Sequence, residues 1–126
     1  MMAAKTDLWG DIAPAQVRTP LAILREQAAL LGEKTKNLVE AKVATSVNGP
    51  QFVHRFNLVV PSMIQFTYEL FTVRHGIEMY PINVPADPPN ANVLATEQEF
   101  IEWLRGELSS EGTKKIVSNL LAQVSS

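Results

Sequence analysis

The chain has 126 residues, with 11 Lys and Arg against 13 Asp and Glu, a formal net charge of −2, and no cysteine. That length suits one domain with its own core, and the composition excludes disulfide scaffolds, thiol catalysis and thiolate zinc sites. The acidic balance argues against a nucleic-acid partner, which needs a basic face. Because there is neither a membrane-length apolar run nor a signal peptide, we also expect no membrane partner and a cytoplasmic location.

Residues 1–18 predict an irregular leader, and residues 19–126 predict a single α+β domain. Trp9 is the one aromatic side chain that could pin this leader to the domain. The pair Thr19-Pro20 then predicts a helix start, because threonine caps helices and proline is tolerated at the first helical position. An apolar stripe at helical spacing follows, ending near Gly32 and formed by Leu21, Leu24, Ala28 and Leu31.

Four strand-like runs come next, at residues 38–47, 52–60, 64–74 and 77–84. Asn48-Gly49 is a strong hairpin signal between the first two runs. His75-Gly76 predicts a tight reversal between the last two. Pro81 and Pro85 cannot donate to a sheet ladder, which places the fourth run at an edge. The short connections predict an antiparallel meander.

The remaining third of the chain predicts a loop and two helices. Residues 85–95 contain three prolines and should form a loop. Thr96 and Glu99 have the spacing of a capping box, and the next helix should bury Phe100, Leu104 and Leu108. A break at Ser109-Ser110 precedes a last helix to about Gln123. The predicted fold class is therefore α+β, a four-stranded antiparallel meander sheet with one N-terminal and two C-terminal helices.

The third and fourth runs carry apolar residues on both faces, whereas a sheet covered on one side should be polar on the other. A bulge near Leu70-Phe71 would restore a single apolar face. Otherwise the second face is covered by the N-terminal segment, by the proline loop or by another subunit. Of these we favour another copy of the chain, most simply in a two-fold dimer. The predicted interface consists of Phe71, Val73, Tyr80, Ile82 and Val84, with Arg74 and His75 at its rim.

His54 is the first candidate for a general base, and the hairpin register points it into the core or its margin. A histidine there is most often a hydrogen-bonded core residue, and no nucleophile or carboxylate has a fixed relation to it. His75, at the proposed turn, should be exposed. Glu69 and Glu78 are expected on one face of the same hairpin but far apart, as solvated carboxylates. The two histidines lack metal-binding spacing, so we expect no metal and no cofactor.

Three functions stay open from the sequence. The favoured one is a non-enzymatic interaction module that self-associates and binds a protein partner, in the manner of an adaptor, chaperone or immunity protein. The second is a carrier of a small apolar ligand in a sheet–helix pocket lined by Phe52, His54, Phe56, Phe66 and Tyr68. The third is an enzyme that uses His54 with a nearby carboxylate.

Overall fold

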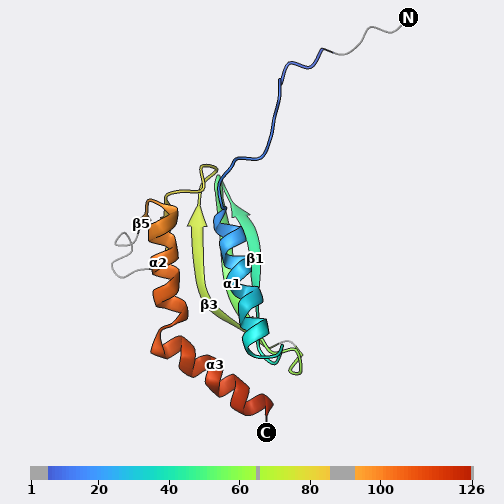
Figure 1. Ribbon diagram of the computed structural model, residues 1–126, viewed down its shortest axis with the longest axis vertical. Helices are drawn as coiled ribbons and strands as arrows, with labels where there is room; N and C mark the ends of the chain where they lie inside the picture. The colour runs from blue at the N-terminus through green and yellow to red at the C-terminus, as the bar shows by residue number, and fades with distance from the viewer. Residues whose placement is uncertain (1–5, 65, 86–92, 126) are drawn as a thin grey trace, which may run out of the picture.

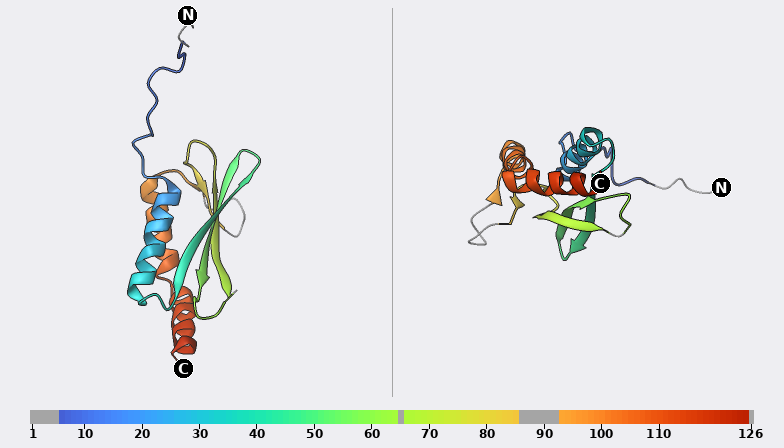
Figure 2. Two further views of the ribbon diagram at one scale, coloured as in Figure 1. Left: turned by 90° about the vertical axis from the view of Figure 1, so that its right-hand side faces the viewer. Right: turned by 90° about the horizontal axis from the view of Figure 1, so that it is seen from below.

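A computed structural model describes residues 6–64, 66–85 and 93–125 as a helix layer on one face of an antiparallel sheet. The sheet has five strands in the order β1-β2-β3-β4-β5, and the helices α1, α2 and α3 lie on its one side (Figures 1 and 2). The predicted α+β class, with one N-terminal and two C-terminal helices, is confirmed. The fifth strand was not predicted.

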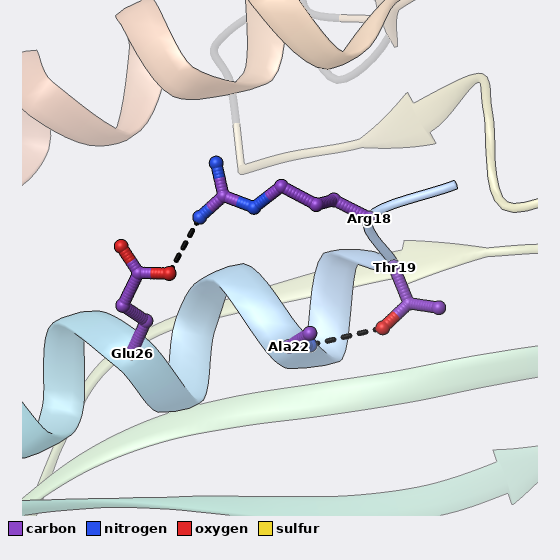
Figure 3. A network of polar contacts seen from close by, with 4 residues as sticks. All are labelled: Arg18, Thr19, Ala22 and Glu26. Carbon is purple, nitrogen blue, oxygen red and sulfur yellow. Dashed lines mark hydrogen bonds and ion pairs between the residues drawn. The ribbon is translucent and has the colours of Figure 1, made fainter. Parts of the chain in front are cut away.

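Helix α1 spans Pro20–Lys34 and begins as predicted. The Thr19 hydroxyl accepts a hydrogen bond from the Ala22 backbone N–H at 3.0 Å, which satisfies one of the free donors of the first turn (Figure 3). The helix is followed by Lys36 and Asn37 with φ of 53° and 63°, left-handed values that turn the chain back toward the sheet. Its buried face consists of Pro20, Ile23, Leu24, Ala28 and Gly32, so the stripe is rotated slightly from the predicted one.

Strands β1 (Glu40–Asn48) and β2 (Gln51–Val59) form the predicted hairpin. Asn48 pairs with Gln51, so the two-residue turn is Gly49-Pro50, one position later than expected. Gly49 has φ of +59°, which glycine adopts without a steric penalty. Val43 pairs with Phe56 and faces the helices with it, as the alternation of apolar residues predicted.

Strand β3 (Thr67–His75) contains the bulge that restores a single apolar face. Phe56 pairs with Phe71 and Asn57 pairs with Glu69, which leaves Leu70 as the extra residue. Phe71 and Val73 therefore point toward the helices, and the Phe71 ring stacks on that of Phe56 at 5.1 Å between centroids. The opposite face of the sheet carries polar side chains, including an Arg55–Glu69 ion pair at 3.6 Å.

The predicted outer interface on the third and fourth strands is thus wrong in its placement. Phe71, Val73, Ile82 and Val84 are buried in the core of the single chain, with exposed fractions of 0–6%. Tyr80 is half-buried and packs against the same core. The physical reason is the bulge, which shifts Phe71 and Val73 to the covered side of the sheet.

The predicted turn at His75-Gly76 is also wrong, because β3 continues to His75 and pairs it with Ile82. Residues 76–81 form the connection, in which Met79 has a left-handed φ of 73° and Pro81 lacks a backbone donor. The fourth strand is reduced to Ile82–Asn83, β4, and Glu78 lies in the connection rather than opposite Val73. Strand β5 (Val93–Leu94) lies in the predicted loop over residues 85–95, of which 86–92 fall outside the described residues.

Helices α2 (Glu97–Leu108) and α3 (Glu111–Val124) are separated at Ser109-Ser110, as predicted. The capping box is present: the Glu99 N–H donates to the Thr96 hydroxyl at 3.1 Å, and the Thr96 N–H donates to Glu99 at 3.3 Å. Helix α2 buries Phe100 and Leu104 against the sheet, and α3 adds Leu120. Together with Phe56, Leu58 and Val39, these side chains belong to one core between the two layers.

Replacing Thr96 by alanine should lower the free energy of unfolding by about 1 kcal/mol, because the Glu99 N–H and the first turn of α2 lose their cap. Thr96→Ser, which keeps the hydroxyl, serves as the matched control and should stay within a few tenths of the wild type. Urea denaturation followed by circular dichroism measures both variants. An alanine variant as stable as the wild type would show that the cap contributes nothing to the stability of α2.

Candidate functional site

A groove with a volume of about 810 Å³ lies between α1 on one side and α2 and α3 on the other. Figure 1 shows β3 passing behind the space between α1 and α2. The floor and walls are apolar and come from all three helices: Ile23 and Leu31 from α1, Ile101, Leu104 and Leu108 from α2, and Val117 from α3. We call this surface the helix groove.

Charged side chains surround the helix groove. Among the described residues that line it, four are cations and one is a carboxylate: Arg18, Lys34, Arg105, Lys114 and Glu26. Glu26 is neutralised by Arg18, whose guanidinium donates to it at 2.6 Å and lies along α1 (Figure 3). Lys34, Arg105 and Lys114 are exposed and have no such carboxylate partner in an ion pair of the described residues. The groove is therefore cationic, although the whole chain is acidic.

A second, smaller cavity of about 170 Å³ continues from the helix groove toward the sheet. It shares Leu31, Leu108 and Val117 with the groove and reaches Phe56 and Leu70 on the strands. The bulge residue Leu70 and the stacked Phe56 thus form its inner wall. The cavity therefore extends the apolar floor of the groove toward the sheet, below the cations of its rim.

The second candidate feature is a pair of buried histidines near the start of β2 and at the end of β3. His54 on β2 and His75 on β3 are 2% and 6% exposed, and their Nε2 atoms lie 2.8 Å apart. His54 Nδ1 is 2.9 Å from the Thr45 hydroxyl oxygen, and His75 Nδ1 is 2.8 Å from the Gly76 carbonyl oxygen. The prediction that His54 faces the core is confirmed. The prediction that His75 is exposed is wrong, because β3 extends through it.

These contacts fix the protons of the pair. A carbonyl oxygen only accepts, so His75 carries its proton on Nδ1 and donates it to Gly76. In the neutral ring the other nitrogen, Nε2, then accepts a hydrogen bond from the N–H at His54 Nε2. His54 Nδ1 in turn accepts from the Thr45 hydroxyl. The neutral pair is a fully satisfied chain of hydrogen bonds, whereas two protonated rings would bring two N–H groups face to face.

The environment of His54 favours its neutral form. Burial of the imidazole, followed by charge interactions with His75 and Arg25, lowers the pKa of His54 from 6.5 to about 4. The hydrogen-bond partners of its ring are a hydroxyl and another imidazole, and no carboxylate of the described residues bonds to it. This arrangement is that of a structural core pair, and the hypothesis of an acid–base His54–carboxylate site gains no support from it.

The five residues predicted to line one sheet–helix pocket do not form one. His54 and Phe56 are buried, while Phe52, Phe66 and Tyr68 are 37–43% exposed. Phe52 stacks on His75 at 5.4 Å between ring centroids. Only Phe56 of the five lines a cavity described here, the smaller one.

The sequence reasoning missed the helix groove as a site. Its apolar residues were assigned to helix stripes and its cations to helix ends, and each assignment is correct locally. The groove arises because α1 and α2 stand apart over the sheet and α3 crosses at their lower end (Figure 2). Of the five large apolar residues of α3, only Leu120 is fully buried; the other four are half-buried against the core, and Val117 among them lines the groove.

No protein-family model, no curated protein and no solved structure matches this chain. Within residues 6–64, 66–85 and 93–125, no three histidine, aspartate or glutamate side chains gather as metal ligands. The helices in the same part of the chain are all too short or too polar to cross a bilayer.

Proposed function

We propose that this protein is a non-enzymatic interaction module that self-associates and binds a protein partner, and that the helix groove is its binding surface. The observation that carries the proposal is the groove itself, about 810 Å³ in volume, apolar at its floor and cationic at its rim. This location replaces the strand interface predicted from the sequence. The cytoplasmic location remains the one expected from the sequence.

The chemistry of the groove defines its ligand. Apolar side chains from three helices favour a ligand that buries apolar groups, and grooves between helices are common sites for such ligands. Lys34, Arg105 and Lys114 add positive charge around that floor and favour carboxylates nearby. A protein segment in which apolar residues alternate with aspartates or glutamates supplies both. We therefore assign the groove to an acidic, apolar protein segment.

The other two functions have less support. The carrier hypothesis named a pocket lined by five residues, of which only Phe56 lines a described cavity, and that cavity of about 170 Å³ lies below the roughly 300–1,000 Å³ of typical ligand pockets. The enzyme hypothesis required a carboxylate beside His54, where the described contacts are Thr45 and His75. The interaction module needs neither feature.

Selection of random peptides on the immobilised protein tests the groove as a binding surface. Enriched peptides should combine large apolar residues with Asp or Glu, and should bind the Val117→Glu variant at least about tenfold more weakly, since the new charge lies in the apolar wall. Ile77→Glu is the matched control, because Ile77 is 84% exposed and lies outside the groove. Equal binding to the wild type and Val117→Glu would overturn the assignment.

A further inference from the structure

The leader has the composition that the helix groove requires. Leu8, Trp9 and Ile12 are 89%, 83% and 72% exposed, so the aromatic expected to pin the leader makes no such contact. Asp7 and Asp11 lie beside these apolar residues within a six-residue stretch. Three large apolar side chains held in water this way are unfavourable for an isolated chain, and they mark a contact site.

The leader also runs away from its own groove. It leaves the first turn of α1 and extends beyond the helices and the sheet, along the long axis of the molecule (Figures 1 and 2). Docking in the groove of the same chain would require a complete reversal just before Arg18. A second copy can receive the leader without that reversal.

We infer that residues 7–12 of one copy dock in the helix groove of a second copy, and that the exchange is reciprocal. The inference rests on the proposed function, and it names the partner segment as the chain's own leader. Leu8, Trp9 and Ile12 bury against the apolar floor, while Asp7 and Asp11 approach the lysines of the rim.

Length and charge agree with this docking. Six extended residues span about 20 Å, at roughly 3.3 Å each, and the wall from Ile23 to Lys34 rises about 17 Å along α1. The two carboxylates of the leader face a rim that carries Lys34, Arg105 and Lys114. In a two-fold pair the second leader docks after the first without a new encounter between molecules, which strengthens the dimer.

Two variants that reverse the charge of the leader or of the groove test the inference. The first variant carries Asp7→Lys and Asp11→Lys, and the second carries Lys34→Glu and Lys114→Glu. Each alone opposes like charges, and its dimer dissociation constant in sedimentation should rise at least about tenfold above that of the wild type. An equimolar mixture restores opposite charges in both contacts, so native mass spectrometry should detect a heterodimer.

The controls use neighbouring charges of the same sign. Lys36→Glu with Lys115→Glu changes the net charge equally, but neither residue lines the groove, so this variant should dimerise like the wild type. Trp9→Ser should weaken the dimer, whereas Ile64→Ser, which removes a side chain that is 88% exposed elsewhere, should not. All these positions are exposed, and circular dichroism should show folded variants.

The outcomes separate this inference from the proposed function. A wild type that stays monomeric at 100 µM overturns both the exchange and self-association, while peptide binding in the groove stands or falls by its own test. A wild-type dimer that is indifferent to the charge variants overturns the exchange and leaves self-association in place. Two monomeric variants whose mixture stays monomeric would also overturn it, because the charges would not meet across copies.

Discussion

Phe56→Ala should lower the free energy of unfolding by about 3–5 kcal/mol, as is typical when a large aromatic is removed from a packed core. Phe56 is 1% exposed, and its ring stacks on Phe71 with an interplanar angle of 9°. Phe71 in turn meets the edge of Trp103 from α2, so Phe56 lies in the contact that joins sheet and helices. Urea titration monitored by circular dichroism measures the loss.

The size of the loss depends on how far the site can collapse. Phe56 already borders the smaller cavity, so alanine would enlarge an existing void instead of opening an isolated one. Ile64→Ala is the control, because that side chain is 88% exposed and its removal should change stability by less than about 0.5 kcal/mol. A Phe56→Ala loss below about 1.5 kcal/mol would contradict the role assigned to the stacked ring.

Acidification should destabilise the protein by about 3 kcal/mol through His54 alone. Its pKa is lowered from 6.5 in the unfolded chain to about 4 in the fold, and each pKa unit corresponds to about 1.4 kcal/mol. Since the folded state holds the neutral ring, this stabilisation is fully present above pH 6.5. It is lost progressively as the pH falls toward 4, where the unfolded chain binds a proton that the fold excludes. Urea unfolding at pH 7.5, 6, 5 and 4 measures it.

His54→Gln provides the matched comparison for the pH series. A glutamine amide can donate toward His75 Nε2 and accept from the Thr45 hydroxyl, but it does not titrate. Between pH 7.5 and 4, the variant should therefore lose less stability than the wild type by about the contribution of His54. Parallel pH profiles for the two proteins would show that His54 is not the group that excludes the proton.

The helices were largely predictable because their signals are local. Thr19, Thr96 and Glu99 are caps whose partners lie within three residues, and the structure forms each contact. The core anchors Leu24 and Leu104 followed from spacing along single helices, and both are buried. The hairpin at Gly49 was likewise encoded in adjacent residues.

The errors arose where one element decides the conformation of another. The pairing of Phe56 with Phe71 depends on where β3 bulges, and alternation along β3 alone left that open. The contact between His54 and His75 joins residues 21 positions apart, so neither residue indicates it by itself. The helix groove depends on the separation of α1 from α2, which no single helix specifies.

The bulge in β3 has a consequence for changes in chain length. Leu70 is the unpaired residue between the Phe56–Phe71 and Asn57–Glu69 pairs. If it were deleted, these pairs would become consecutive rungs of a regular ladder, with Phe71 still inward and Glu69 still outward. Deletion of a residue outside the bulge, such as Val73 or Arg74, with Leu70 still unpaired, would instead reverse the faces of the strand on one side of the gap. The bulge at Leu70 and Phe71 is thus the place in β3 where a one-residue deletion preserves the two faces of the sheet, and homologues that differ in length within this strand should differ there.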